Sequence, residues 1–181
     1  IGEQYKIIGL YEAGISEEIP EDFESLEENA FQKANYIFDK YGGNCMADDT
    51  GLEVDALDGR PGVFSARYSR MGEIQFPELN ADQGNIKKLL MELENKEIRR
   101  ARFRTVIALI LEERKYLFEG IVNGVILKKP IGSDGFGYDP VFQAQGYKKS
   151  FAEMDIQEKN RISHRAIATR KLVEFLKTCN M

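Results

Sequence analysis

The 181-residue sequence contains no tryptophan, one histidine (His164) and only two cysteines, Cys45 and Cys179. The cysteines are far apart and match no metal-ligand spacing, so we expect reduced thiols rather than a disulfide framework or a zinc site. The chain also lacks an apolar run of ~20 residues and a basic leader followed by an apolar stretch. These absences argue against a membrane helix and a signal peptide, and they make the cytoplasm the expected location.

Positive charge is in deficit. The 25 Lys and Arg residues against 30 Asp and Glu residues give a formal net charge of −5. Proteins that bind nucleic-acid polymers usually present a basic face, so DNA and RNA are not expected partners. A small anionic ligand stays compatible with this charge if a metal ion or local positive charge offsets it. The hydrophobic fraction of 43% is ordinary for a globular protein, and the length suits one domain over residues 1–181.

Helical and strand periodicities alternate along the chain. We expect a helix that begins after Ser25 and ends at Gly42-Gly43, a helix over 79–93, a helical turn over 155–160 and a last helix that begins near Ser163. The expected strands are 5–10, 44–47, 52–56, 100–111, 116–122, 125–127 and 141–142. A polar turn at 112–115 makes a hairpin, and Asn123-Gly124 is expected to be a second turn or a bulge. This mixture predicts an α/β or α+β domain, with a mixed central sheet flanked by helices.

An acidic pair, Asp48-Asp49, stands between a short apolar run and Thr50-Gly51. Adjacent carboxylates repel each other, so a pair at a strand end favours a cation, and Mg²⁺ is the natural hard ion. A plain turn stays open as the alternative, because Asp and Gly dominate tight turns. Glu28 is expected to converge with the pair, although it also has the spacing to cap the Ser25 backbone N–H.

The glycine-rich loop 132–140 holds Phe136 between two glycines. Such an aromatic ring is free to lie flat on a planar ligand. Asp139, extended before Pro140, can accept a hydrogen bond from a ring N–H or a sugar hydroxyl. The alternative is a surface loop whose aromatic residues only anchor it to the core.

Polar residues gather before the last helix. Ser163 can cap that helix, and its N-terminus with Lys159 and Arg165 suits an anion or a keto oxygen. His164 alone is also explained as a capping or packing residue, and no Ser or Cys has the surroundings of a nucleophile. The arginines at 99, 100, 102 and 104 are interpreted as the solvated side of a strand.

Together, the motifs resemble the inosine triphosphate pyrophosphatase family, which acts on non-canonical purine nucleoside triphosphates. The matching motifs, in the order of the family, are Glu-Asn-Ala at 28–30 with Lys-Ala at 33–34, Ala-Asp-Asp-Thr-Gly-Leu at 47–52, Pro-Gly-Val-Phe-Ser-Ala-Arg-Tyr at 61–68, Phe-Gly-Tyr-Asp-Pro at 136–140, Glu-Lys-Asn at 158–160 and Ser-His-Arg at 163–165. The resemblance implies hydrolysis of ITP, dITP or XTP to the monophosphate and pyrophosphate. It also implies a Mg²⁺-dependent homodimer with two lobes and a cleft between them.

The resemblance further implies roles for individual residues. Glu28 and Asp49 resemble metal ligands, with Asp48 in support, and Asp49 also resembles the base for the attacking water. Thr50 resembles a phosphate contact. The implied contacts to the purine nucleoside are Phe136 as the stacking ring with its neighbours Gly137 and Tyr138, Asp139 and Lys159 as polar contacts, and His164 with Arg165 as the readers of the 6-keto edge.

The sequence departs from the family at its start. The family opens with a strand and a Thr/Ser-x-Asn-x-x-Lys loop that binds the triphosphate, and no such motif is present. Residues 1–4 resemble the end of the helix that follows that loop. We therefore expect a single domain that lacks this strand and loop. Two alternatives stay open: an impaired nucleotide-binding or dimer-forming remnant, and a pyrophosphatase for modified pyrimidine nucleotides.

Overall fold

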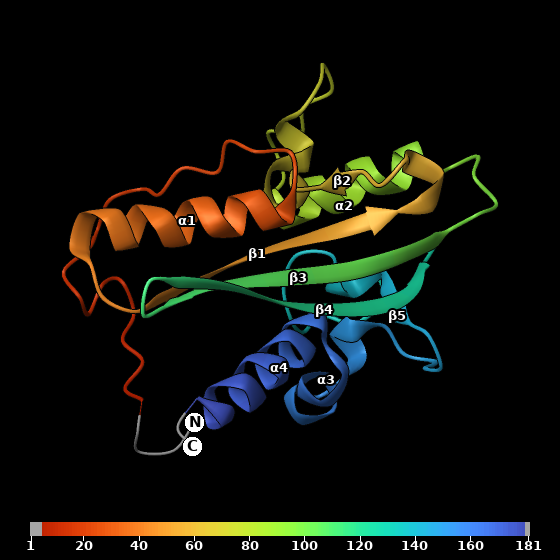
Figure 1. The fold of residues 1–181 in the computed structure, drawn as a ribbon. Helices are drawn as coiled ribbons and strands as arrows, with labels where there is room; N and C mark the ends of the chain where they lie inside the picture. Colours follow the sequence, from red (N-terminus) through yellow and green to blue (C-terminus); the bar gives the residue numbers. More distant parts are fainter. Residues whose placement is uncertain (1–4, 180–181) are drawn as a thin grey trace.

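The computed structural model describes residues 5–179, so the expectation for residues 1–4 lies outside it. A five-stranded sheet runs through the centre, with α1 on one face and α3 and α4 on the other (Figure 1). The strands, in sheet order, are β2 (Pro61–Gly62), β1 (Cys45–Val54), β3 (Arg100–Leu111), β4 (Arg114–Ile126) and β5 (Phe142–Ala144). The α-helices are α1 (Leu26–Tyr41), α2 (Ala81–Glu92), α3 (Ile156–Ile162) and α4 (His164–Thr178).

The predicted fold class is confirmed, with one difference in the sheet. Every strand pair among the described residues is antiparallel, where we expected a mixed sheet. The predicted strand at 5–10 is also wrong, because this segment is irregular and leads into a turn. Its apolar side chains Ile7, Ile8 and Leu10 are exposed. Strand propensity describes how a side chain fits a sheet surface, and here the segment pairs with no described strand.

Helix α1 has both expected ends. The Ser25 side chain accepts a hydrogen bond from the Glu28 backbone N–H (3.2 Å), and Gly42 ends the helix with a φ of 70°. The buried stripe of α1 covers one face of the sheet: Leu26, Ala30 and Ala34 pack on Val106, Ala108 and Ile110 of β3. The helix therefore has a fixed rotation, which presents Asn29 and Lys33 to β1.

Strand β1 is continuous through the acidic pair. The sequence predicted a break or a turn at Asp48-Asp49, and the structure places both residues in register with Ile107 and Val106 of β3. A ten-residue ladder satisfies more backbone groups than an isolated turn, so pairing overrides turn propensity. Because side chains alternate along a strand, Asp48 and Asp49 point to opposite faces of the sheet.

The β3–β4 hairpin turns at Glu112 and Glu113, whose φ values of 49° and 65° are those of a type I′ turn. Asn123 and Gly124 form neither a turn nor a bulge, because both pair in register with β3. A Cβ atom at Gly124 would lie 2.3 Å from the Gln143 carbonyl oxygen, so the glycine admits β5.

Helix α4 lies close against the sheet. A Cβ atom at Gly120 of β4 would lie 1.9 Å from the His164 carbonyl oxygen, so this glycine lets the start of α4 approach the sheet. Further along the helix, Ala168, Leu172 and Leu176 pack on Ile107 and Leu109. No helix within residues 5–179 has the length and hydrophobicity to span a membrane.

Candidate active site

A cavity of about 740 Å³ opens beside the first turn of α4. The structure brings together in its wall all eight residues that the sequence assigned to substrate binding: Thr50, Phe136, Gly137, Tyr138, Asp139, Lys159, His164 and Arg165. A larger hollow of about 1180 Å³ beside α2 contains none of these eight. Residues that are more than 100 positions apart therefore converge on one site.

Phe136 is an open aromatic platform on a fixed backbone. Its side chain is 65% exposed, while its backbone N–H donates to Asp139 Oδ2 (2.8 Å). The next N–H, of Gly137, donates to Asp82 of α2 (2.8 Å). The Lys159 ammonium lies 4.8 Å from the centre of the Phe136 ring. The loop is therefore tied down on both sides of Phe136, and its aromatic ring does not serve as a core anchor.

Asp139 is buried and holds the loop together. Besides accepting from Phe136, its carboxylate forms an ion pair with Lys159 of α3. Gly135, at φ 81°, is required here because a Cβ atom would lie 2.1 Å from Asp139 Oδ2. Tyr138 is also buried, and its hydroxyl donates to the Ser65 carbonyl oxygen (3.0 Å). Tyr138 thus anchors the loop from inside.

His164 is a buried, neutral imidazole in the cavity wall. Its ring stacks on Phe103 with centroids 4.6 Å apart. Burial, together with the charges of Arg165 and Lys159, lowers its pKa to about 3. Its Nδ1 atom has no hydrogen-bond partner among the described residues. An unpaired buried polar atom costs free energy, so a group that enters the cavity gains by pairing with it.

Arg165 is half-exposed and turns toward β1. It donates to Asp48 Oδ2 (3.0 Å) and approaches the Thr50 hydroxyl (3.5 Å). The Thr50 hydroxyl also lies 2.7 Å from that of Thr105. Asp48 therefore belongs to the α4 face of the sheet and neutralises an arginine there.

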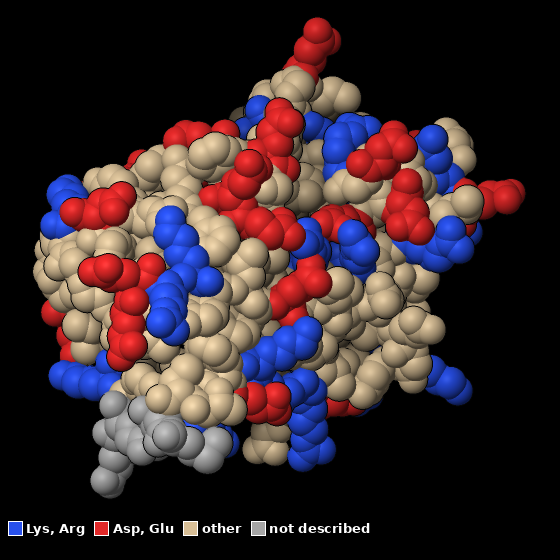
Figure 2. Space-filling view, viewed as in Figure 1, with Lys and Arg blue, Asp and Glu red and all other residues tan. Residues whose placement is uncertain are grey.

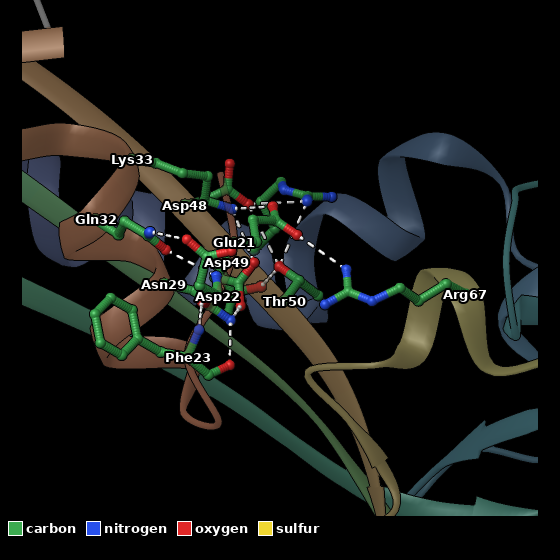
Figure 3. Close-up of polar contacts among 12 residues, drawn as sticks. Glu21, Asp22, Phe23, Asn29, Gln32, Lys33, Asp48, Asp49, Thr50 and Arg67 are labelled. Atoms are coloured by element: carbon green, nitrogen blue, oxygen red, sulfur yellow. Dashed lines mark hydrogen bonds and ion pairs between the residues drawn. The ribbon is translucent and has the colours of Figure 1, made fainter. Parts of the chain in front are cut away.

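Asp49 belongs to a separate cluster on the α1 face (Figure 3). Its carboxylate binds Lys33 Nζ (2.8 Å) and accepts from Asn29 Nδ2 (3.4 Å). Lys33 also binds Glu21 (2.7 Å), and Glu21 reaches Arg67 (3.4 Å). Lys33 thus stands between two carboxylates from different segments of the chain.

The cluster shifts the pKa of both partners in the central pair. Burial raises the pKa of Asp49, and the opposing effect of Lys33 does not offset it. Burial disfavours the charged form of Lys33, but its hydrogen bonds to Asp49 and Glu21 outweigh this effect and raise its pKa. Asp49 is consequently a carboxylate with a proton affinity above its ordinary value.

The expected convergence of Glu28, Asp48 and Asp49 does not occur. Glu28 accepts a hydrogen bond from the Ser25 hydroxyl (2.6 Å) rather than from its backbone N–H, and Asp48 faces away from Asp49. Within residues 5–179, no group of three or more Asp, Glu, His or Cys side chains is poised around one metal position. The carboxylate that approaches the same cation as Asp49 is Glu21.

Sequence reasoning missed Glu21, Asn29 and Lys33 as site residues. Glu21 lies in the irregular segment before α1, so no helix or strand periodicity marked it. The available signal was Lys33, one helical turn after Asn29, on a face of α1 next to buried alanines. A lysine at such a position needs carboxylate partners.

Comparison with known proteins places the chain in one family. The model of the Ham1 family matches residues 2–175. A dITP/XTP pyrophosphatase of Flavobacterium psychrophilum is 50% identical over 175 residues, which cover 97% of this chain and 88% of that protein. The dITP/XTP pyrophosphatase of Porphyromonas gingivalis is 51% identical, over 94% of this chain and 85% of that protein. The structure of the Staphylococcus aureus Ham1 protein superposes with a TM-score of 0.87 at 37% identity, covering 98% of this chain and 89% of the other. The motifs, the fold and these relatives agree, and the chain belongs to the Ham1 family.

Proposed function

We propose that the protein hydrolyses non-canonical purine nucleoside triphosphates (dITP, XTP and ITP) to the monophosphate and pyrophosphate. The observation that carries the proposal is the single cavity that gathers all eight expected substrate residues. Relatives that are about half identical and named dITP/XTP pyrophosphatases support the same substrate class. The comparisons give no support to a non-catalytic remnant or to a pyrimidine-specific enzyme.

At the base end, Phe136 stacks on the purine, while His164 and Arg165 recognise its 6-keto edge. The neutral imidazole of His164 carries one N–H, and Arg165 carries only donors. Donors at this edge pair with a keto oxygen and oppose the amino group of adenine. An unpaired buried group costs ~1–3 kcal/mol, which corresponds to about 5- to 150-fold discrimination against ATP.

The nucleotide crosses the open edge of β1. On one side, β1 pairs with β3 along its whole length; on the other, only Leu52 and Glu53 pair with β2 among the described residues. The cavity lies on the α4 side of this edge, and the Asp49 cluster lies on the α1 side. With the base in the cavity, the phosphates pass Thr50 and reach Asp49.

We propose that the Asp49 cluster holds Mg²⁺ in place of the Lys33 ammonium that now lies between Glu21 and Asp49, because carboxylate oxygens are the donors that Mg²⁺ prefers. We propose Glu21 and Asp49 as the protein ligands, in place of the expected set with Glu28 and Asp48. The metal, when bound, neutralises charge that develops on the phosphates. Asp49 also accepts the proton of the attacking water. Dependence on Mg²⁺, dimerisation and a cytoplasmic location are proposed on the family resemblance.

The test is pyrophosphate release from dITP, XTP, ITP and ATP, with and without Mg²⁺. We expect Mg²⁺-dependent release from the first three and much slower release from ATP. Equal turnover of ATP would overturn the proposed selectivity. Unimpaired turnover by Asp49→Asn would overturn the proposed mechanism.

A further inference from the structure

The segment before α1 is fastened along that helix in antiparallel order. Glu17 binds Lys40, Glu21 binds Lys33, Asp22 pairs with Gln32, and Phe23 pairs with Asn29. Figure 3 shows the last three of these contacts gathered beside Asp49. The segment 17–23 carries Glu21, so its fastening decides where the Glu21 carboxylate lies. We call it the Glu21 strap.

Asn29 binds the backbone of the strap and, like Lys33, also reaches Asp49. Its Oδ1 atom accepts from the Phe23 backbone N–H (2.9 Å), and its Nδ2 atom donates to the Phe23 carbonyl oxygen (3.1 Å). Since Phe23 N–H is only a donor, the orientation of the Asn29 amide is fixed. The same Nδ2 group then donates to Asp49 Oδ2 (3.4 Å). Asn29 is fully buried, so these partners are not replaced by water.

We propose that Asn29 is a positioning residue that sets the Glu21 strap and the Asp49 carboxylate in one geometry. This inference rests on the proposed function. One planar amide contacts both the strap backbone and Asp49, so a movement of either changes the other. Asn29 does not touch the substrate in this arrangement. It acts through Glu21 and Asp49, and loss of such supporting hydrogen bonds lowers metal affinity or activity by ~10- to 100-fold.

Gln32 provides a matched control on the same helix. Its side-chain amide pairs with Asp22 in the same way, accepting from the Asp22 N–H (2.9 Å) and donating to the Asp22 carboxylate (2.6 Å). Gln32 fastens the neighbouring residue of the strap without contacting Asp49. Both Asn29→Ala and Gln32→Ala remove a contact between α1 and the strap, but only Asn29→Ala also removes a contact to Asp49. Comparing the two variants therefore separates the effect of loosening the strap from the effect of losing the Asp49 contact.

The experiment measures amide hydrogen exchange, Mn²⁺ affinity by electron paramagnetic resonance, and dITP kinetics in each variant of the 181-residue chain. Asn29→Ala should expose the Phe23 amide, weaken Mn²⁺ binding about tenfold and lower kcat ~10- to 100-fold, with KM little changed. Gln32→Ala should expose the Asp22 amide and leave kcat and Mn²⁺ affinity close to those of the parent.

Asn29→Asp keeps the volume and the acceptor for Phe23 N–H, but it turns an oxygen toward Asp49. We expect a protected Phe23 amide with a low kcat. If Asn29→Ala does not fold, this variant tests the positioning role of Asn29 in its place. Equal kcat and Mn²⁺ affinity in the Asn29 and Gln32 variants would overturn the positioning role. If the parent releases no pyrophosphate, the proposed function fails, while the exchange and Mn²⁺ measurements still test Asn29.

Discussion

Asp48 and Asp49 are neighbours in the chain and belong to opposite faces of the sheet. Asp48 binds Arg165 of α4 (3.0 Å), whereas Asp49 binds Lys33 of α1 (2.8 Å). Arg165 and Asp48 are half-exposed, and Lys33 and Asp49 are largely buried. Two acids that look equivalent in the sequence therefore have different partners and different solvation.

This difference predicts unequal effects of two matched substitutions. Asp49→Asn removes the proposed base, and we expect kcat to fall by ~10²- to 10⁴-fold. Asp48→Asn frees Arg165 without touching the Lys33 cluster, so it should change KM more than kcat. Steady-state kinetics with dITP distinguish the two. Comparable loss of kcat in both variants would show that the acids act together.

The position of Glu21 beside Lys33 predicts that Glu21 contributes more to activity than Glu28 does. Glu21→Gln removes one of the two carboxylates on Lys33, and we expect activity to fall ~10- to 100-fold with a raised Mg²⁺ requirement. Glu28→Gln changes a side chain that contacts Ser25, so activity should stay within about twofold. Mg²⁺ titrations of pyrophosphate release test both. The reverse ranking would restore Glu28 as the ligand.

The exposed ring of Phe136 predicts a binding effect without a stability effect. Phe136→Ala removes a stacking platform worth ~1–3 kcal/mol per base, so KM for dITP should rise about 5- to 150-fold. The thermal midpoint should hardly change, because the side chain is 65% exposed. Phe136→Tyr keeps the ring and should keep the affinity. A large loss of thermal stability in Phe136→Ala would assign the ring to the core.

The burial of His164 predicts that its imidazole titrates well below the pH at which a solvated histidine does. Its pKa of about 3 lies below the unfolded value of about 6.5, so the folded protein disfavours the protonated form. The stabilising contribution is complete above about pH 6.5 and is lost as pH falls toward 3, by up to ~1.4 kcal/mol per pH unit.

Because His164 is the only histidine, one imidazole signal in the proton NMR spectrum reports this directly. The signal should not shift between about pH 5 and 8. His164→Gln should reduce the dependence of the unfolding free energy on pH between about pH 3 and 6.5. A midpoint near 6.5 would mean that the imidazole is solvated.

The sequence predicted elements whose signals are local. Ser25 and Gly42 mark the ends of α1 by capping chemistry, and the hairpin follows from its polar turn. The residues of the cavity beside α4 were also predictable, because each of their motifs is a continuous stretch and the order of the motifs matched a known family. Even so, their convergence on one cavity depends on sheet order, which residue spacing alone does not specify.

The Asp49 cluster was not predictable in the same way. Glu28 has the better local pattern, but Glu21 reaches Lys33 because the strap runs back along α1. The strand at 5–10 failed for a related reason: its apolar residues have strand propensity without a described partner strand. Both errors come from tertiary contacts that a local pattern does not contain.

The unbroken pairing of β1 with β3 has an evolutionary consequence. An insertion or deletion of one residue in β1 before Asp48 would leave the positions of both acids unchanged if the pairing after it were kept. A shift of the whole strand by one residue would instead exchange the faces to which the two acids point. Asp48 would then meet Lys33, and Asp49 would meet Arg165, with no change in composition. The β1–β3 register thus determines which acid faces which helix, and length changes that shift it should be tolerated less well than substitutions.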